Sequence, residues 1–341
     1  MNNCYTSTDG SSSTKTLLSL LGIVLFVSVL YSTGITIDSV WQAMIQTQPI
    51  YIFFMVITTV GIVGLTSIKW QIILRSLNIC IYPAAGYYFY YCAIGLLSNS
   101  VIPQVGNYFL KARSLKNEFN VPTATSLQSV YQEQVFDLII LITIIGPSFL
   151  FFFKLTSVAM TRILYLFIVL AVVMLTLRSK RSIFQWINGV LVLLARFLSI
   201  FPVLRERFAS AQALFNLPPP PNKTCLWLYF NSIIKYSIIS ARIYIVMVAI
   251  GIDFSYWHIF FGTPMIQIIL LLGVTFGGIG ASDAGWFFFL FSFGVDKNDI
   301  GNFLILERIL SLGALSFVTF SSYLYYRAQV AYGTVRDGQT P

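Results

Sequence analysis

The sequence predicts an all-α fold, a polytopic membrane helical bundle of about eight transmembrane helices with additional re-entrant segments. Composition is the first reason: hydrophobic residues make up 57% and charged residues 10% of the 341 residues, whereas a soluble domain carries roughly 25% charged residues. The mean hydropathy is +0.80. Several apolar runs also reach the roughly 20 residues needed to cross a bilayer. No stretch of the chain is long and polar enough to form a soluble domain of useful size.

Six apolar runs are predicted to cross the membrane, namely 17–37, 50–68, 124–152, 160–177, 225–250 and 301–327. The first run is long and no small-residue cleavage site follows it, so we interpret it as an uncleaved span and not as a signal peptide. The segments that stay ambiguous are 84–101, 184–201 and the pair 257–276 and 285–294. We expect a flexible cytoplasmic tail at 1–15, a single membrane domain at 16–330 and a cytoplasmic tail at 331–341.

Basic residues predict the orientation of the chain. The segments 38–49 and 251–256 contain acids but neither Lys nor Arg. Lys and Arg gather at the alternate ends of the spans, at Lys69, Arg75, Arg178, Lys180, Arg181, Arg205, Arg207, Lys223, Arg327 and Arg336. The positive-inside rule then places both termini in the cytoplasm. These loops also account for the net charge of +9, and since the chain has no basic domain, nucleic-acid binding is not expected.

The same rule bears on the ambiguous segments. The basic group Lys111, Arg113 and Lys116 stays cytoplasmic only if 84–101 turns back without crossing. The alternative is that 84–101 spans and that this group is external. By the same reasoning, 184–201 is interpreted as an interfacial or re-entrant helix.

A proline-rich hinge within 202–224 divides the chain into two portions. Each portion contains a broken hydrophobic segment, 84–113 in the first and 257–294 in the second. An odd number of spans lies between them, so the two segments would enter from opposite sides of the membrane. This arrangement is typical of an inverted repeat with a binding site at the repeat interface.

The most informative stretch is Gly277-Gly278-Ile279-Gly280-Ala281-Ser282-Asp283-Ala284-Gly285, which lies between two apolar runs. Glycines loosen a helix, and an acid is costly at membrane depth. Both features together predict a broken helix that lines a ligand-binding cavity inside the bilayer. Close helix packing is the alternative for the glycines, but it does not account for Asp283.

Asn99 to Asn107 form a second constellation, followed by Lys111 and Arg113. Pro103 ends the helical geometry and Gly106 permits a tight turn. Freed backbone amides with the two cations favour anion binding; the alternative is a loop with ordinary interfacial cations.

Three further groups of charges lie within predicted spans. Glu133 and Asp137 are four residues apart, which places them on one helix face that we predict to be internal; a helix end outside the membrane is the alternative. Lys235 and Arg242 are seven apart and also share a face. Snorkelling explains Lys235 if it lies near a helix end, whereas the deeper Arg242 requires a partner such as Glu133, Asp137 or Asp283.

Glu307 and Arg308 are adjacent and point in different directions on a helix, so each requires its own partner. The four cysteines are scattered and His258 is the only histidine, so neither a metal site nor a cofactor is expected. The sequence motifs of soluble hydrolases and of nucleotide-driven pumps are absent.

Together these motifs resemble the lysylphosphatidylglycerol synthase transmembrane-region family, which is also called flippase-like. The resemblance covers about residues 15–330. The matching positions are Asn99, Pro103, Gly106, Asn107 and Lys111 or Arg113, then Glu133 to Asp137, then Gly277, Gly278, Gly280 and Asp283, and finally Arg308. The chain departs from the family at Asn107 and Asp283, where the family has an acid and a glutamate, and at Gln134, where it has an arginine.

The resemblance implies lipid handling, so we expect a lipid translocase that binds a phospholipid or lipid-linked sugar head group in a polar cavity and is not an enzyme. The residues expected to bind the head group are Asn99, Pro103, Gly106, Asn107, Lys111, Arg113, Glu133, Asp137, Arg242, Gly277, Gly278, Gly280, Asp283 and Arg308. The alternatives are a membrane-embedded glycosyltransferase acting on a polyprenyl-phosphate lipid and a non-catalytic partner in polysaccharide assembly of the cell envelope. The partners considered are membrane lipids, a second copy of the chain and envelope-biosynthesis proteins.

Overall fold

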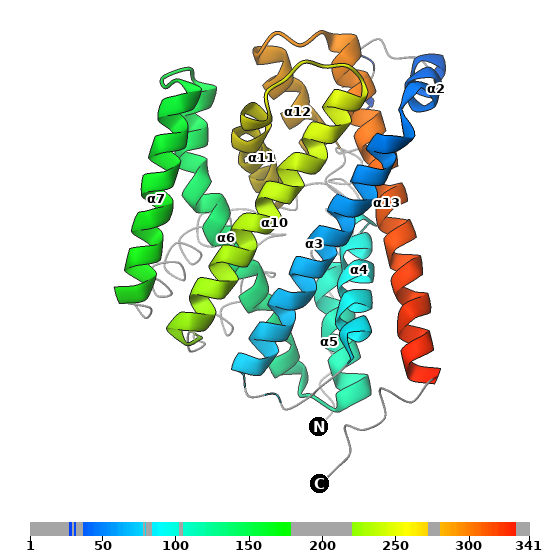
Figure 1. Cartoon of the computed structure of the whole chain (residues 1–341), viewed down its shortest axis with the longest axis vertical. Coiled ribbons are helices and arrows are strands. Elements are labelled where there is room, and N and C mark those ends of the chain that lie inside the picture. Colours follow the sequence, from blue (N-terminus) through cyan, green and yellow to red (C-terminus); the bar gives the residue numbers. More distant parts are fainter. Residues whose placement is uncertain are drawn as a thin grey trace, which may run out of the picture.

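The structure, a computed structural model, describes residues 27–28, 31, 37–77, 79, 84–101, 105–178, 220–271 and 280–331. Every regular element within these residues is a helix, as the composition predicts. Most of the helices run roughly along the long axis of the molecule and form one bundle (Figure 1). We call the end at the top of Figure 1 the upper end and the opposite one the lower end.

Five of the described helices are long and apolar enough to cross a membrane. They are α3 (Pro49–Ser76), α6 (Thr123–Phe152), α7 (Val158–Arg178), α10 (Asn222–Ala249) and α13 (Lys297–Ala331). Five of the six predicted spans are therefore confirmed, while 17–37 lies almost wholly outside the described residues, as do 184–201 and most of the proline-rich hinge. Helix α2 (Ile37–Gln46) lies at the upper end of α3 (Figure 1).

The five long helices alternate in direction along the chain. In Figure 1, α3 and α7 run from the upper to the lower end, while α6 and α10 run from the lower to the upper end, and α13 returns to the lower end. α3 packs mainly against α10, and α6 packs against α7 and α10.

The first ambiguous segment forms a helical hairpin with the segment that follows it. Helices α4 (Ala85–Val101) and α5 (Val105–Phe119) pack against each other, and both occupy the lower half of the bundle (Figure 1). Gly106 permits this close approach, since a Cβ atom at that position would lie 2.6 Å from Ser98 Cβ. A hairpin in one half of the bundle is the geometry that the interpretation of 84–101 as a re-entrant segment requires.

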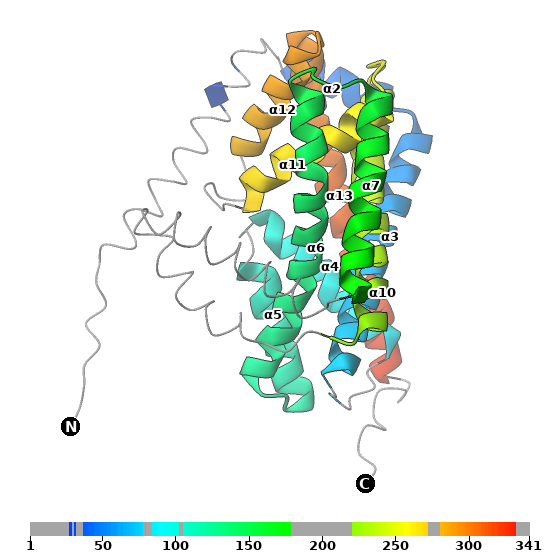
Figure 2. The ribbon, with the colours of Figure 1, turned by 90° about the vertical axis from the view of Figure 1, so that its left-hand side faces the viewer.

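The second broken segment is a hairpin that enters from the opposite end. Helices α11 (Tyr256–Leu271) and α12 (Ala281–Ser292) pack against each other in the upper half of the bundle (Figures 1 and 2). A Cβ atom on Gly262 would lie 2.4 Å from Phe289 Cζ, so a glycine again permits the contact. The two hairpins therefore enter from opposite ends, as the interpretation as an inverted repeat requires.

The predicted end of the second span is wrong. We expected 50–68 to end before Lys69, with this lysine in a cytoplasmic loop. Instead α3 continues to Ser76, and Lys69 is completely buried inside the bundle. The helix continues because Trp70, Ile73 and Leu74 are also buried and extend its packed face beyond the lysine.

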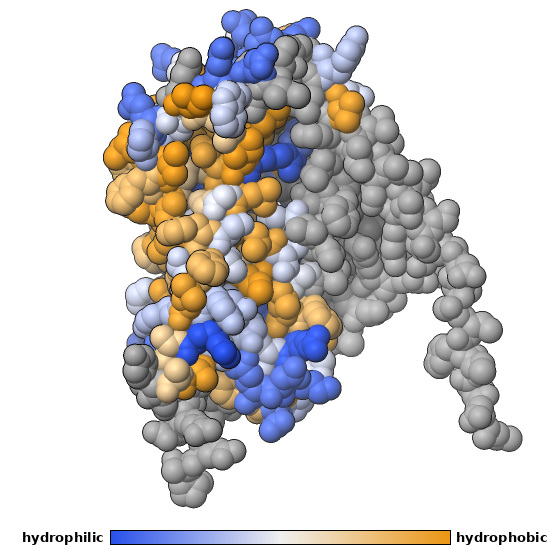
Figure 3. All heavy atoms as spheres, turned by 90° about the vertical axis from the view of Figure 1, so that its right-hand side faces the viewer, coloured by the Kyte–Doolittle hydropathy of each residue, from blue (hydrophilic) through white to orange (hydrophobic). Residues whose placement is uncertain are grey.

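Hydrophobic side chains cover much of the outer surface. On α7, for example, Met160, Phe167 and Met174 are exposed. Figure 3 shows hydrophobic groups on the described part of one face, between hydrophilic groups at its two ends. An apolar belt between polar ends is the surface that a multi-pass membrane protein presents to hydrocarbon.

Candidate functional site: buried ion pairs inside the bundle

The first buried ion pair joins the lower hairpin to the following span. Lys111 Nζ on α5 lies 2.7 Å from Glu133 Oε2 on α6, and both side chains are 0% exposed. The same ammonium group lies 5.1 Å from the centre of the Trp70 ring, within range of a cation–π interaction. Glu133 therefore faces the interior, as predicted. Its second oxygen, Oε1, has no hydrogen-bond partner among the described residues.

A second cluster links three long helices through one carboxylate. Asp137 on α6 forms ion pairs with both Lys69 on α3 and Lys235 on α10, the second at 2.8 Å. Ser232 Oγ donates to Asp137 Oδ1 at 2.9 Å and accepts from Lys69 Nζ at 3.2 Å. Asp137 lies fourteen residues after Thr123, about 21 Å along the helix at 1.5 Å per residue, so the cluster lies near the middle of α6.

The third ion pair joins the upper hairpin to the last span. Asp283 in the first turn of α12 accepts two hydrogen bonds from Arg308 on α13, one of them from Nε at 3.0 Å. It also accepts from the backbone N–H of Gly280 at 2.8 Å. Gly280 has a φ of 85°, a left-handed conformation that glycine adopts without strain. Helix α12 thus begins directly after Gly280, within the motif for which a broken helix was predicted, and the Asp283 carboxylate orients Arg308.

Arg242 has a partner that differs from the expected ones. Its Nη2 atom lies 3.9 Å from Glu307 Oε1, whereas we expected Glu133, Asp137 or Asp283. Glu307 Oε1 also accepts a hydrogen bond from Ser311 at 2.8 Å. The expected acids are engaged by other cations that lie closer in the bundle. Glu307 and Arg308 do have separate partners, as their adjacent positions predict.

A hydrogen bond between a side chain of α4 and the backbone of α5 links the two helices of the lower hairpin. Asn99 Oδ1 accepts from the backbone N–H of Asn107 at 3.2 Å. Asn107 is buried, and its own side-chain oxygen has no partner among the described residues. Arg113 is exposed and lies over the Phe109 ring at 5.6 Å. Of the two cations proposed for an anion, Lys111 is therefore engaged by Glu133 and Arg113 faces outward.

The structure places the residues proposed from sequence in separate groups and not in one site. Glu133, Lys111 and Asp137 lie between the lower hairpin and the spans, and Asp283 and Arg308 lie at the start of the upper hairpin's second helix. Three predicted positions, Pro103, Gly277 and Gly278, lie outside the described residues.

Sequence reasoning missed the roles of Lys69, Lys235 and Glu307. Lys235 is not near a helix end, as snorkelling would require, but midway along α10. A usable signal existed for Lys69, because the apolar run continues beyond it through Trp70 and Leu74. A lysine inside such a run must find a buried partner.

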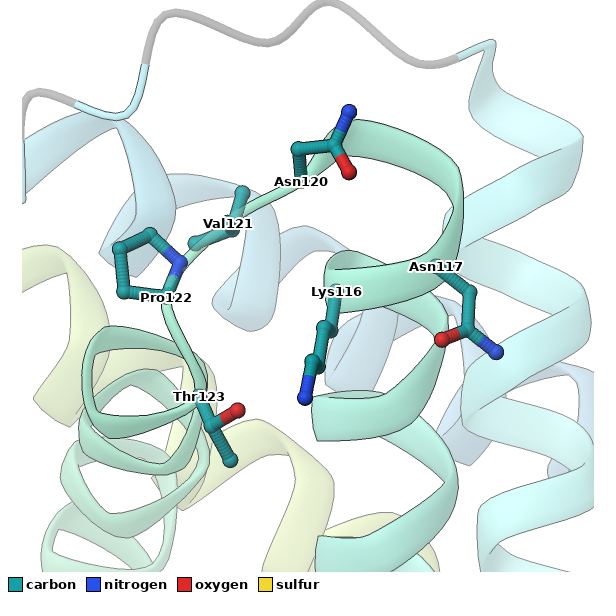
Figure 4. A pocket seen from close by; sticks show the side chains of 6 residues that line it. All are labelled: Lys116, Asn117, Asn120, Val121, Pro122 and Thr123. Atoms are coloured by element: carbon teal, nitrogen blue, oxygen red, sulfur yellow. The ribbon is translucent and has the colours of Figure 1, made fainter.

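A surface cavity of about 520 Å³ lies at the lower end, and its lining residues stand between Lys111 and Glu133 in the sequence. The turn between α5 and α6 lines it, through Lys116, Asn117, Asn120, Val121, Pro122 and Thr123. Figure 4 shows Lys116 and Thr123 on either side of the open space. Within the described ranges, no three His, Cys, Asp or Glu side chains form a group that could hold a metal ion.

Comparison with known proteins gives one match. The family described as lysylphosphatidylglycerol synthase TM region matches residues 17–318. No curated protein and no solved structure matched the chain. The matched region contains both hairpins and all five ion pairs described above.

Proposed function

Because this chain belongs to the lysylphosphatidylglycerol synthase TM region family, we propose that it is a lipid translocase of the plasma (inner) membrane. The polar interior would bind the head group of a phospholipid or a lipid-linked sugar, while the acyl or prenyl tails stay in the bilayer. A head group is costly to move through hydrocarbon, and a polar interior lowers that cost.

The observation that carries the proposal is the arrangement of the two re-entrant hairpins. Each enters from a different end of the bundle, and each is tied to the following span by a buried pair, Lys111 with Glu133 and Asp283 with Arg308. Discontinuous helices from opposite sides that meet near mid-membrane are typical of transporters that expose one site alternately. A hairpin that shifts as a unit would open the interior to one leaflet at a time.

The distribution of basic residues supports the proposed orientation. Arg75, Arg113, Arg178 and Arg327 lie on helix segments that approach the lower end. Asp253 follows the upper end of α10 and Asp296 precedes the upper end of α13, where Lys297 begins the helix, and Lys154 follows the upper end of α6. The positive-inside rule supports a cytoplasmic lower end, which would place both termini in the cytoplasm.

The experiment that tests the proposal compares the lipids bound by wild type and by Asp283→Asn. Each protein is extracted from its membrane directly into native nanodiscs, and the co-purified lipids are identified by mass spectrometry. Asp283→Asn removes the charge that holds Arg308. The matched control is Asp296→Asn, which makes the same chemical change at an exposed position. Elution as a single species of unchanged size shows that each variant still folds.

We expect one head-group class to be enriched with wild type and Asp296→Asn and to be lost with Asp283→Asn. The enriched lipid, labelled with a fluorophore, is then reconstituted with each protein to measure its passage between leaflets. Bulk membrane lipid in all three samples, with no passage in vesicles, would contradict a translocase. A new covalent product formed from the lipid and a sugar donor would instead identify a transferase.

A further inference from the structure

Among the ion pairs of the described residues, the charges balance except at Asp137. Five ion pairs are present within the described residues, and they are formed by five cations and four acids: Lys69, Lys111, Lys235, Arg242 and Arg308 with Glu133, Asp137, Asp283 and Glu307. Three of the acids each serve one cation, whereas Asp137 is shared by two lysines. One positive charge is therefore in excess, and it belongs to the Asp137 cluster.

The two lysines of this cluster also have unused hydrogen-bonding capacity. An ammonium group carries three donors. Within the described residues, Lys69 Nζ donates to Asp137 and Ser232, while Lys235 Nζ donates to Asp137 alone. One donor of Lys69 and two of Lys235 thus remain available to an acceptor that the described residues do not supply.

The cluster is enclosed but not sealed. The side chain of Lys69 is 0% exposed, that of Lys235 is 10% exposed and that of Asp137 is 23% exposed. A small group can therefore approach the cluster from the side of Asp137 and Lys235. An uncompensated positive charge at this depth is costly, and a bound anion would offset that cost.

We propose that Lys69 and Lys235 bind the phosphate group of a lipid, with Asp137 holding the two ammonium groups apart. This inference rests on the proposed function and assigns its head-group contact. An ionised phosphodiester carries one negative charge, which equals the excess of the cluster, and its two free oxygens suit the available donors. Lysine binds phosphate as a point charge, so the contact requires no bidentate geometry.

This assignment replaces the contact suggested by sequence spacing. Lys111 is neutralised one to one by Glu133, and Arg113 is exposed over Phe109. Neither residue combines burial with an excess charge. Lys69 and Lys235 combine both, although they are 166 positions apart in the chain.

The test measures binding of soluble probes to the full-length protein in a nonionic detergent. Dihexanoylphosphatidylglycerol supplies a phosphodiester, dihexanoylglycerol supplies the same tails without phosphate, and inorganic phosphate supplies the anion without tails. Lys235→Gln removes the excess charge and leaves Lys69 and Asp137 paired, while Lys235→Arg keeps the charge. Arg75→Gln is the matched control, since it removes one exposed cation from α3.

We expect wild type to bind the phosphatidylglycerol probe and not dihexanoylglycerol. Loss of a charge-assisted contact lowers the affinity about tenfold or more, so Lys235→Gln should weaken binding by at least that factor. Lys235→Arg and Arg75→Gln should stay close to wild type. Melting temperatures measured for all four proteins show that the comparison is made between folded molecules.

Equal weakening by Lys235→Gln and Arg75→Gln would overturn the site, because it would indicate a general effect of net charge. Inorganic phosphate binding as tightly as the lipid probe would overturn the lipid as the source of the phosphate. If lipid passage is observed but Lys235→Gln binds normally, the phosphate site fails and the translocase stands. If binding depends on Lys235 but no lipid crosses the membrane, the translocase fails and the site stands.

Discussion

Lys111→Met is expected to destabilise the protein strongly, because it leaves a carboxylate buried without a counterion. Glu133 and Lys111 are both 0% exposed and lie 2.7 Å apart. Removing one partner of such a pair costs about 3–5 kcal/mol, whereas an exposed pair is worth about 0–1 kcal/mol. The cation–π contact with Trp70 is lost as well, which adds roughly 0.5–2 kcal/mol. Glu133→Met should cost a similar amount, since it leaves the ammonium group buried alone.

The double substitution Lys111→Met with Glu133→Met separates the cost of an unpaired buried charge from the loss of the cation–π contact. It removes both charges and leaves an apolar contact, and replacing a buried pair by apolar residues is often neutral or stabilising. We therefore expect the double variant to recover most of the loss, with a residual of roughly 0.5–2 kcal/mol from the absent cation–π contact. The free energy of unfolding is measured by tryptophan fluorescence in mixed micelles of dodecyl maltoside and SDS. Additive losses in the double variant, or a loss of less than about 1 kcal/mol for Lys111→Met, would refute the buried pair.

Two further predictions concern the hairpins and the orientation. Gly106→Ala and Gly262→Ala should each destabilise the protein by about 1–3 kcal/mol, because the added methyl group overpacks a hairpin contact. Gly313→Ala should not destabilise it, because nothing lies within 4 Å of the added Cβ atom. Equal melting temperatures for all three variants would contradict the close approach. In a variant whose native cysteines are serine, Asp296→Cys should react with an impermeant maleimide outside intact cells, and Lys116→Cys only after permeabilisation. The reverse labelling pattern would contradict the cytoplasmic lower end.

The helices were predictable where a long apolar run decides the structure locally. The spans at α6, α7, α10 and α13 agree with the predicted runs to within a few residues. The break between α4 and α5 was also predictable, because Pro103 and Gly106 interrupt the apolar run there. The end of α3 was not, since Lys69 reads as a loop residue until its buried partner Asp137 is known.

The pairing of charges was only partly predictable, because it depends on which helices become neighbours. Glu133 and Asp137 share a face by spacing alone, and Glu307 and Arg308 must diverge. Yet Glu133 pairs with α5 and Asp137 with α3 and α10, and no local pattern indicates those neighbours. The partner of Arg242 was unpredictable for the same reason. Three acids at a similar predicted depth were considered, but the acid that lies next to it in the bundle is a fourth, Glu307.

The two halves of the described chain follow the same plan with reversed charges. A span, a hairpin and a second span occur as α3, α4–α5 and α6, and again as α10, α11–α12 and α13. In the first half the hairpin carries the cation and the span the acid, Lys111 with Glu133. In the second half the hairpin carries the acid and the span the cation, Asp283 with Arg308.

This pairing has a physical consequence for the proposed translocase. Each hairpin charge is paired with a charge of the following span, so a hairpin that moved away from its span would leave both charges without a partner. An unpaired charge inside the bundle is costly. The proposed movement therefore requires each hairpin to shift together with the span that holds its counterion, or a lipid head group to replace the lost partner.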